Sequence, residues 1–151
     1  MRVREVMSTK LKTVTPKDAV ENAWQLMRGE HIHHLVVVER GGVVGVLSAD
    51  DAGGSRGTAL RRGRSVSEMM NAPAVTVDAD TTIKRAANLM RGRSIGSLVV
   101  LEGNRPAGIV TTSDLLELLG RGAIRPTPAG RRPALNFRAP HRKRSRAYGV
   151  W

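Results

Sequence analysis

Two short stretches of the chain place a hydroxyl three residues before a carboxylate. The first runs Gly45-Val46-Leu47-Ser48-Ala49-Asp50-Asp51, and Gly108-Ile109-Val110-Thr111-Thr112-Ser113-Asp114 repeats it 63 positions later. In each, an apolar strand end leads to the hydroxyl, and a helix can begin before the aspartate. N–H groups at a helix start attract phosphate, and a carboxylate can accept hydrogen bonds from both hydroxyls of a ribose. The same spacing matches the capping box of an ordinary helix, so nucleotide binding and simple capping both stay open.

The offset of 63 residues extends over most of the chain. It aligns residues 3–7 with 66–70, residues 26–29 with 89–92 and residues 35–37 with 98–100, with no gap up to the two aspartates. A coincidence would not keep register over that length, so the sequence indicates a duplicated unit. We predict a first unit at residues 1–60, a second at 61–120 and a tail at 121–151. Residues 1–7 and 54–65 are interpreted as linkers.

The pattern of each unit predicts the element order β-α-β-β-α. Short strands are expected at residues 12–14 and 74–77, and valine-rich hairpins follow at residues 32–47 and 98–111. Neither unit could bury its own helix and sheet faces alone, so we predict one mixed α/β (α+β) body.

The helix boundaries follow from residue types that cap helices. Thr15 and Asp78 are predicted N-caps of the first helix of each unit, and Gly29 and Gly92 are predicted to end these helices. A second helix is expected to end at Gly120. In the first unit the dipeptide 53–54 is Gly-Gly, so the corresponding helix should be short, late or deformed.

The formal net charge of +12 is concentrated in the tail. Residues 121–151 hold nine arginines and lysines and no acid, which leaves +3 for residues 1–120. The tail contains four prolines and little apolar periodicity, so we expect it to be disordered in isolation. Cysteine is absent, no apolar run reaches the roughly 18 residues of a membrane helix, and the N-terminus lacks a secretory signal. These features predict a cytoplasmic protein without disulfides or a membrane partner.

The repeated unit resembles the cystathionine β-synthase (CBS) domain. The likeness rests on an opening Val-x-x-Val/Met-Met, on Thr-Val before a helix, on Leu-Met near the end of that helix, and on the motif Gly-x-x-Ser/Thr-x-x-Asp. The pair resembles a Bateman module over roughly residues 1–120. The resemblance implies that two units pack through their sheets with pseudo-twofold symmetry and leave two clefts. It implies that the clefts bind an adenosine compound (AMP, ADP, ATP or S-adenosylmethionine), and that the protein is a homodimer that regulates an effector protein.

The resemblance also assigns residues to the two clefts. Ser48 and Asp51 would serve one cleft, and Thr111 and Asp114 the other, with the aspartate on the ribose and the hydroxyl near phosphate. Since glycines interrupt the helix after Asp51, we expect the Asp114 cleft to be the stronger. Further contacts to the base or the phosphate are predicted at Thr13, Val14, His33, His34, Thr76, Val77 and Ser97.

Three histidines, His31, His33 and His34, stand where the second unit has Ser94, Gly96 and Ser97. A closed metal site needs three or four ligands, and no cysteine or further nearby histidine supplies them, so we predict no metal site. Histidines 33 and 34 could contact a ligand, or could simply lie half-buried on a strand. Trp24 has helical spacing with Val20 and Met27 and is predicted to be a core residue.

Two other functional hypotheses stay open. Phe137, Tyr148 and Trp151 lie among the arginines of the tail, a composition that can bind nucleic acid through phosphate charge and base stacking. The simpler interpretation of the tail is a solvated extension. The pair could also be a structural interaction module with vestigial clefts. The chain lacks Gly-x-Ser-x-Gly, a Walker loop and His-Glu-x-x-His, so we predict binding rather than catalysis.

Overall fold

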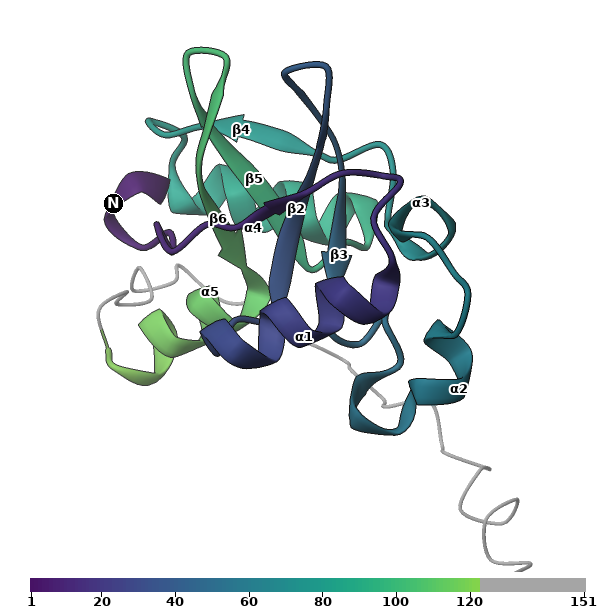
Figure 1. Ribbon diagram of the computed structural model, residues 1–151. Coiled ribbons are helices and arrows are strands. Elements are labelled where there is room, and N and C mark those ends of the chain that lie inside the picture. The colour runs from purple at the N-terminus through teal and green to yellow at the C-terminus, as the bar shows by residue number, and fades with distance from the viewer. Residues whose placement is uncertain (123–151) are drawn as a thin grey trace, which may run out of the picture.

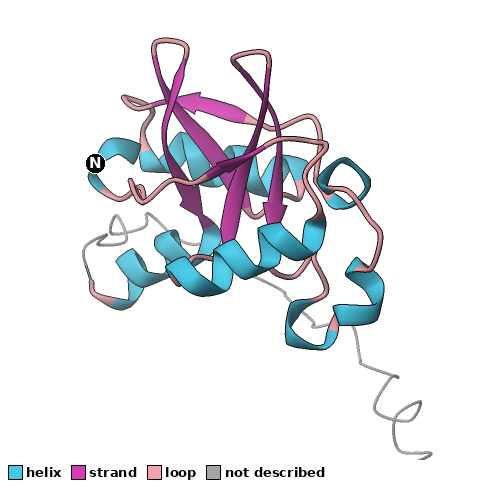
Figure 2. Ribbon diagram, in the orientation of Figure 1, coloured by secondary structure: helices cyan, strands magenta, loops and turns pink. Residues whose placement is uncertain are grey.

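Two three-stranded sheets, one from each repeat, form the centre of the structure (Figures 1 and 2). The computed structural model describes residues 1–122. In each sheet the first strand pairs in parallel with the middle strand, which pairs antiparallel with the third. The first sheet contains β1 (Thr13–Val14), β2 (His34–Glu39) and β3 (Gly42–Ser48), and the second contains β4 (Thr76–Asp78), β5 (Ser97–Glu102) and β6 (Arg105–Thr111). The prediction of a duplicated, mixed α/β architecture is therefore confirmed.

The helices differ between the two repeats at one place. The long helices α1 (Val20–Glu30) and α4 (Ile83–Arg93) correspond to each other, and α5 (Thr112–Gly120) follows the second sheet. At the position of α5 in the first repeat the chain forms only a 3-10 turn, η2 (Gly54–Arg56), and the four-residue helix α2 (Thr58–Arg61). Gly53 and Gly54 both have positive φ, so the predicted interruption of this helix is confirmed.

The hydrophobic core of the described residues consists of three clusters, because both faces of each sheet are buried. One cluster lies between the sheets, and one lies on the outer face of each sheet. Alternate residues of the strands point in opposite directions, so one set faces a helix and the next faces the other sheet. Between the sheets pack Val36, Val46, Val99 and Ile109. On the outer face of the first sheet, Leu35, Val37 and Leu47 pack in one cluster with residues of α1 that include Trp24. Trp24 is 8% exposed, so its prediction as a core residue is confirmed.

The opening segment of each repeat packs on the other repeat. Val3, in the 3-10 turn η1 (Val3–Glu5), is fully buried in the core of the second repeat. Val66, in α3 (Val66–Met69), is fully buried in the core of the first. Backbone hydrogen bonds follow the same exchange, from Val3 N to Thr81 O and from Val66 N to Asp18 O, both at 2.8 Å. The prediction that residues 1–7 form a linker was therefore wrong.

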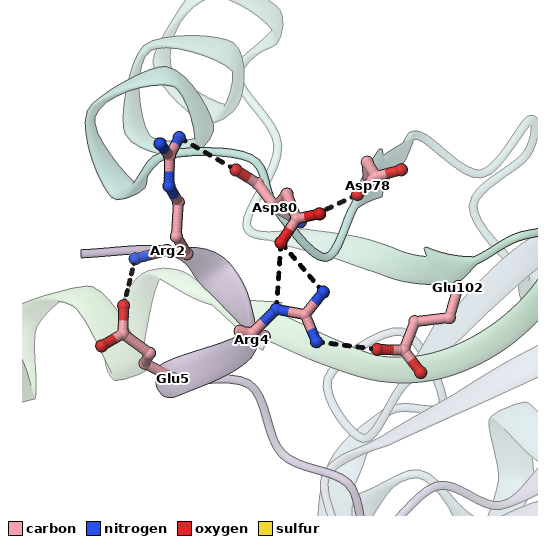
Figure 3. Close-up of polar contacts among 6 residues, drawn as sticks. All are labelled: Arg2, Arg4, Glu5, Asp78, Asp80 and Glu102. Carbon is pink, nitrogen blue, oxygen red and sulfur yellow. Dashed lines mark hydrogen bonds and ion pairs between the residues drawn. The ribbon is translucent and has the colours of Figure 1, made fainter.

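Ion pairs at the surface accompany the exchange (Figure 3). The guanidinium of Arg4 donates to Asp80 Oδ1 at 2.9 and 3.1 Å and to Glu102 Oε1 at 3.0 Å. Arg2 Nη1 donates to the backbone oxygen of Asp80 at 3.1 Å. Such exposed pairs contribute little stability, so the burial of Val3 contributes most to holding the segment in place.

Both long helices begin later than predicted. Thr15 N donates to Asp18 Oδ2 at 2.8 Å, which closes a separate turn, and α1 begins only after Ala19. In the second repeat the N-cap is Thr82, whose hydroxyl accepts from Arg85 N, and not Asp78. The predicted stops were also wrong. Both glycines lie inside the last helical turn, and the left-handed C-cap residues are His31 and Ser94.

A buried arginine holds the interrupted segment of the first repeat. Arg61 is 2% exposed and donates to Glu21 Oε2 at 2.6 Å and to the backbone oxygens of Ala52 and Gly54 at 2.8 and 2.7 Å. Its guanidinium also lies 4.6 Å from the ring centre of Trp24. Arg61 therefore attaches α2 to α1 through Glu21 and Trp24, and to the glycine-interrupted segment through the oxygens of Ala52 and Gly54.

Most of the predicted tail falls outside the described residues. The prediction that the tail is disordered concerns these residues. The aromatic residues singled out in the tail, Phe137, Tyr148 and Trp151, lie there too. Over residues 1–122, none of the helices has the length and apolar character needed to cross a membrane.

Candidate functional site

Each Ser/Thr-x-x-Asp motif begins at the last residue of the last strand of its repeat, Ser48 in β3 and Thr111 in β6. Asp114 N donates to Thr111 Oγ1 at 3.3 Å, and Thr111 N donates to Asp114 Oδ2 at 2.8 Å, which is the capping box of α5. The first repeat makes the same pair of bonds between Ser48 and Asp51, at 2.9 and 3.1 Å. Capping is thus present at both motifs, and what distinguishes them is the space in front of each aspartate.

Thr111 and Asp114 line a cavity of about 420 Å³ that both repeats build. The second repeat supplies the end of β6 and the start of α5, where Ser113 also faces the space. The first repeat supplies Ser48 and the residues between α1 and β2, and the opening segment supplies Ser8 and Lys10. The remaining lining residues are His31, Ile32, His33, His34, Ala49, Asp50 and Ile109. Thr111, His33 and His34, all predicted to contact a ligand, thus meet Asp114 in one place. Ser48 was predicted to serve the cleft of Asp51, but it lines the cavity of Asp114.

His34, which lines this cavity, has a perturbed pKa. Burial lowers the pKa of His34, and the nearby His33 lowers it further, whereas the carboxylates of Asp51, Asp114 and Asp50 oppose the shift. A lowered pKa keeps the imidazole neutral at pH 7, so one ring nitrogen can donate and the other can accept a hydrogen bond. Within residues 1–122, no three His, Asp or Glu side chains gather closely enough to hold a metal ion.

A second, smaller cavity of about 310 Å³ lies at the position related to the first by the repeat. Its walls include Ser97, which was predicted to contact a ligand, and Asn71, which corresponds to Ser8. Asp51, the predicted counterpart of Asp114, is not among the residues that line either cavity, and its carboxylate accepts a hydrogen bond from Asn71 Nδ2 at 2.7 Å. The remaining walls are Val46, Ala72, Pro73, Ala74, Val75, Ser94, Ile95 and Gly96. The two cavities therefore have related positions and different chemistry.

The other predicted contacts lie on the first strand of each sheet. Thr13 and Val14 form β1, and Val14 is buried in the core of the first repeat. Thr76 and Val77 belong to β4, and Val77 packs against the core of the second repeat. These four residues are not among those that line the two motif-related cavities of the described chain.

A wider hollow of about 580 Å³ lies beside Arg61, between Lys17 and Arg64. It holds neither motif, and Arg61 itself is already bonded to Glu21 and to backbone oxygens. The cavity at Asp114 is therefore the better candidate site, although it is the smaller one.

Sequence reasoning missed the residues that the opening segments bring to the cavities. Ser8, Lys10 and Asn71 were not predicted, because the sequence does not show on which repeat an opening segment packs. The glycine that begins each motif was the one sign in the sequence that another segment packs against the motif. A Cβ at Gly108 would lie 2.7 Å from the backbone oxygen of Ser8, and one at Gly45 would lie 2.8 Å from that of Asn71. Each motif begins with glycine because another backbone passes directly over it.

Comparison with known proteins agrees with this architecture. The family model described as CBS domain matches residues 3–52 and 66–121, one match for each repeat. The chain belongs to the CBS domain family. Among solved structures, the CBS domain pair of protein MJ0100, in complex with 5′-methylthioadenosine and S-adenosyl-L-methionine, superimposes with a TM-score of 0.71 at 22% identity. The match covers 81% of this chain and 98% of that one, and at this identity it shows the shared fold.

Relatives of this CBS pair differ widely in length. The CBS domain-containing protein YhcV of Bacillus subtilis is 30% identical over 114 residues, which cover 75% of this chain and 81% of YhcV. The uncharacterized protein MJ1404 of Methanocaldococcus jannaschii is 31% identical over 78% of this chain, but the match spans only 32% of MJ1404. A homoserine O-acetyltransferase of Methanococcoides burtonii is 33% identical over 78% of this chain, which spans 24% of that enzyme. The pair therefore occurs both nearly alone and as a minor part of longer proteins.

Proposed function

We propose that this CBS pair is a cytoplasmic regulatory module that binds an adenosine compound in the cavity at Asp114 and acts through a partner protein. The single observation that carries the proposal is that a hydroxyl and a carboxylate at the start of α5 both line a cavity of about 420 Å³. The complex of the MJ0100 pair with two adenosine compounds supports this class of ligand. AMP, ADP, ATP and S-adenosylmethionine are the candidates.

The residues of the cavity suggest how an adenosine compound would be held. The Asp114 carboxylate would accept hydrogen bonds from the ribose hydroxyls, and the start of α5 with Thr111 would lie next to phosphate. His33 and His34 line the same cavity and would contact the base or the phosphate, with the neutral imidazole of His34 able to donate or accept a hydrogen bond. This use requires binding groups only, so we propose binding without catalysis.

Regulation would follow from the composite walls of the cavity. The opening segment, the α1–β2 connection and the start of α5 all contribute to it, so a bound ligand would bridge both repeats. A ligand shifts an arrangement only as far as its affinities for the two arrangements differ. A second copy of the chain is a candidate partner, because Leu116 and Leu119 on α5 are 66% and 55% exposed. An effector protein would then read the relative position of the repeats.

A thermal-shift panel tests the proposal. AMP, ADP, ATP, NADH and S-adenosylmethionine are compared on the wild type and on Asp114→Ala, with Asp51→Ala as the matched variant. A ligand at 100 times its Kd adds about 2.7 kcal/mol, which raises the Tm of a chain of this size by roughly 5–10 °C. We expect Asp114→Ala to abolish the shift. No shift with any compound, or one indifferent to Asp114, would refute the site.

A further inference from the structure

The two aspartates of the repeated motif differ in how much of their hydrogen-bonding capacity is already used. Asp51 Oδ2 accepts from Ser48 N at 3.1 Å and from Asn71 Nδ2 at 2.7 Å. One carboxylate oxygen has two lone pairs, so these two donors saturate Oδ2. Over the described residues, Asp114 Oδ2 accepts one hydrogen bond, from Thr111 N at 2.8 Å.

A carboxylate holds a ribose diol in the bidentate manner when both of its oxygens have a free lone pair. Two hydroxyls on adjacent carbons can donate to the two oxygens of one carboxylate, provided that neither oxygen is already saturated. Asp114 meets this condition, and Asp51 can meet it only if Asn71 withdraws. Asn71 belongs to the wall of the second cavity and Asp51 does not, so Asn71, hydrogen-bonded to Asp51, stands at the space that a ligand would fill.

Comparison of the two repeats identifies Asn71 as the residue that makes the two aspartates differ. Asn71 corresponds to Ser8 at the offset of 63, and both residues pair through their backbones with the strand before the motif. Asn71 pairs with Val46 and Ser8 pairs with Ile109, so the two positions are equivalent in the fold. The shorter side chain of Ser8 lines the Asp114 cavity and makes no hydrogen bond to Asp114 among the described residues.

We propose that Asn71 closes the Asp51 cleft, so that each chain binds one nucleoside, at Asp114, with Ser8 and Asn71 as the residues that decide which cleft is open. This inference rests on the proposed function of the Asp114 cavity. The glycines after Asp51 act in the same direction, because they replace the longer helix that α5 provides beside Asp114. Of the two motifs, the one at Asp114 thus binds the ligand, and in the one at Asp51 the amide of Asn71 occupies the position of the ligand.

Exchanging the two residues tests the proposal, since each repeat already tolerates its own residue at the shared position. Isothermal titration with AMP, and with 5′-methylthioadenosine as a second probe, should give one site per wild-type chain. Asn71→Ser should add a second site that Asp51→Ala removes. Ser8→Asn should weaken the first site by at least about tenfold, because the new amide would compete for a charged acceptor. Circular dichroism melts check that each variant is folded.

The outcomes separate this proposal from the one on which it rests. Two sites in the wild type, or one site in a folded Asn71→Ser variant, would overturn the role of Asn71 while leaving the Asp114 site intact. An unchanged affinity in folded Ser8→Asn would also overturn it. Failure of both probes to bind the wild type in a manner that depends on Asp114 would refute the proposed function itself, and this inference with it.

Discussion

Replacing Gly108 with alanine should damage both the fold and the candidate site, whereas Gly45→Ala should damage the fold alone. At each position a backbone oxygen of an opening segment lies where the new methyl would go, at 2.7 Å for Ser8 and 2.8 Å for Asn71. Ordinary contact begins at 3.4 Å, so each segment must retreat by about 0.6–0.7 Å. The two variants therefore impose nearly the same local displacement on opposite repeats.

The magnitude follows from the backbone hydrogen bonds that the retreat stretches. Ser8 N donates to Ile109 O at 2.9 Å and Ile109 N donates to Ser8 O at 3.0 Å, and Asn71 makes the same pair of bonds with Val46 at 2.8 and 3.0 Å. Each bond is worth about 0.5–1.5 kcal/mol, and overpacking adds about 1–3 kcal/mol. We expect both variants to lose about 2–4 kcal/mol of unfolding free energy in urea titrations.

AMP affinity distinguishes the two variants. Ser8 and Lys10 form a wall of the Asp114 cavity, so Gly108→Ala should weaken AMP binding by roughly tenfold, since small misplacements of binding groups are costly. Gly45→Ala should leave AMP affinity within about twofold, because Asn71 lines the other cavity. If both variants stay within about 0.5 kcal/mol of the wild type, the close-approach reasoning fails. If both lose AMP affinity equally, the placement of the site is contradicted.

Three further predictions follow from buried groups. Arg61→Met should lower the unfolding free energy by about 3 kcal/mol, because it removes the bonds of the guanidinium to Glu21 and to two carbonyls. Hydrogen bonding to Arg61, and then to Gln25, lowers the pKa of Glu21, so this loss should shrink as the pH falls below 4.5, and urea titrations at pH 7 and pH 3 check it. Val3→Ala and Val66→Ala should each cost about 2 kcal/mol, but hydrogen exchange should accelerate mainly in the second repeat for the former and in the first for the latter. Since burial lowers the pKa of His34, its unfolded form binds a proton more readily, and the wild type should lose stability relative to His34→Ser as the pH falls below 6.5 in pH-dependent melts.

The sequence predicts the sheets of this fold well because the repeat supplies each pattern twice. Valine-rich hairpins at the same offset predict β2–β3 and β5–β6, and the glycines at 53 and 54 predict the defect after the first hairpin. The first residues of the helices are harder to predict from the sequence. Thr15 and Asp18 match a capping pattern, but they close a turn that lies before the helix. Local hydrogen bonding alone does not separate these two outcomes.

The local sequence pattern does not determine on which repeat an opening segment packs, because this depends on tertiary contacts. Val3 and Val66 occupy equivalent positions, and either could pack on its own repeat or on the other without a change in sequence pattern. The candidate site depends on that choice, since Ser8 and Lys10 reach the Asp114 cavity only through the exchange. For the same reason the contact between Asn71 and Asp51, 20 residues apart, could not be predicted from the motif.

A crystal structure of the chain with AMP is the most direct measurement of the central claim. We expect electron density for one nucleotide in the cavity lined by Thr111 and Asp114, with both ribose hydroxyls within about 3.2 Å of the Asp114 carboxylate. Asp51 should keep its hydrogen bond to Asn71 in the same crystal. AMP bound elsewhere, or in this cavity with its ribose away from Asp114, would contradict the account.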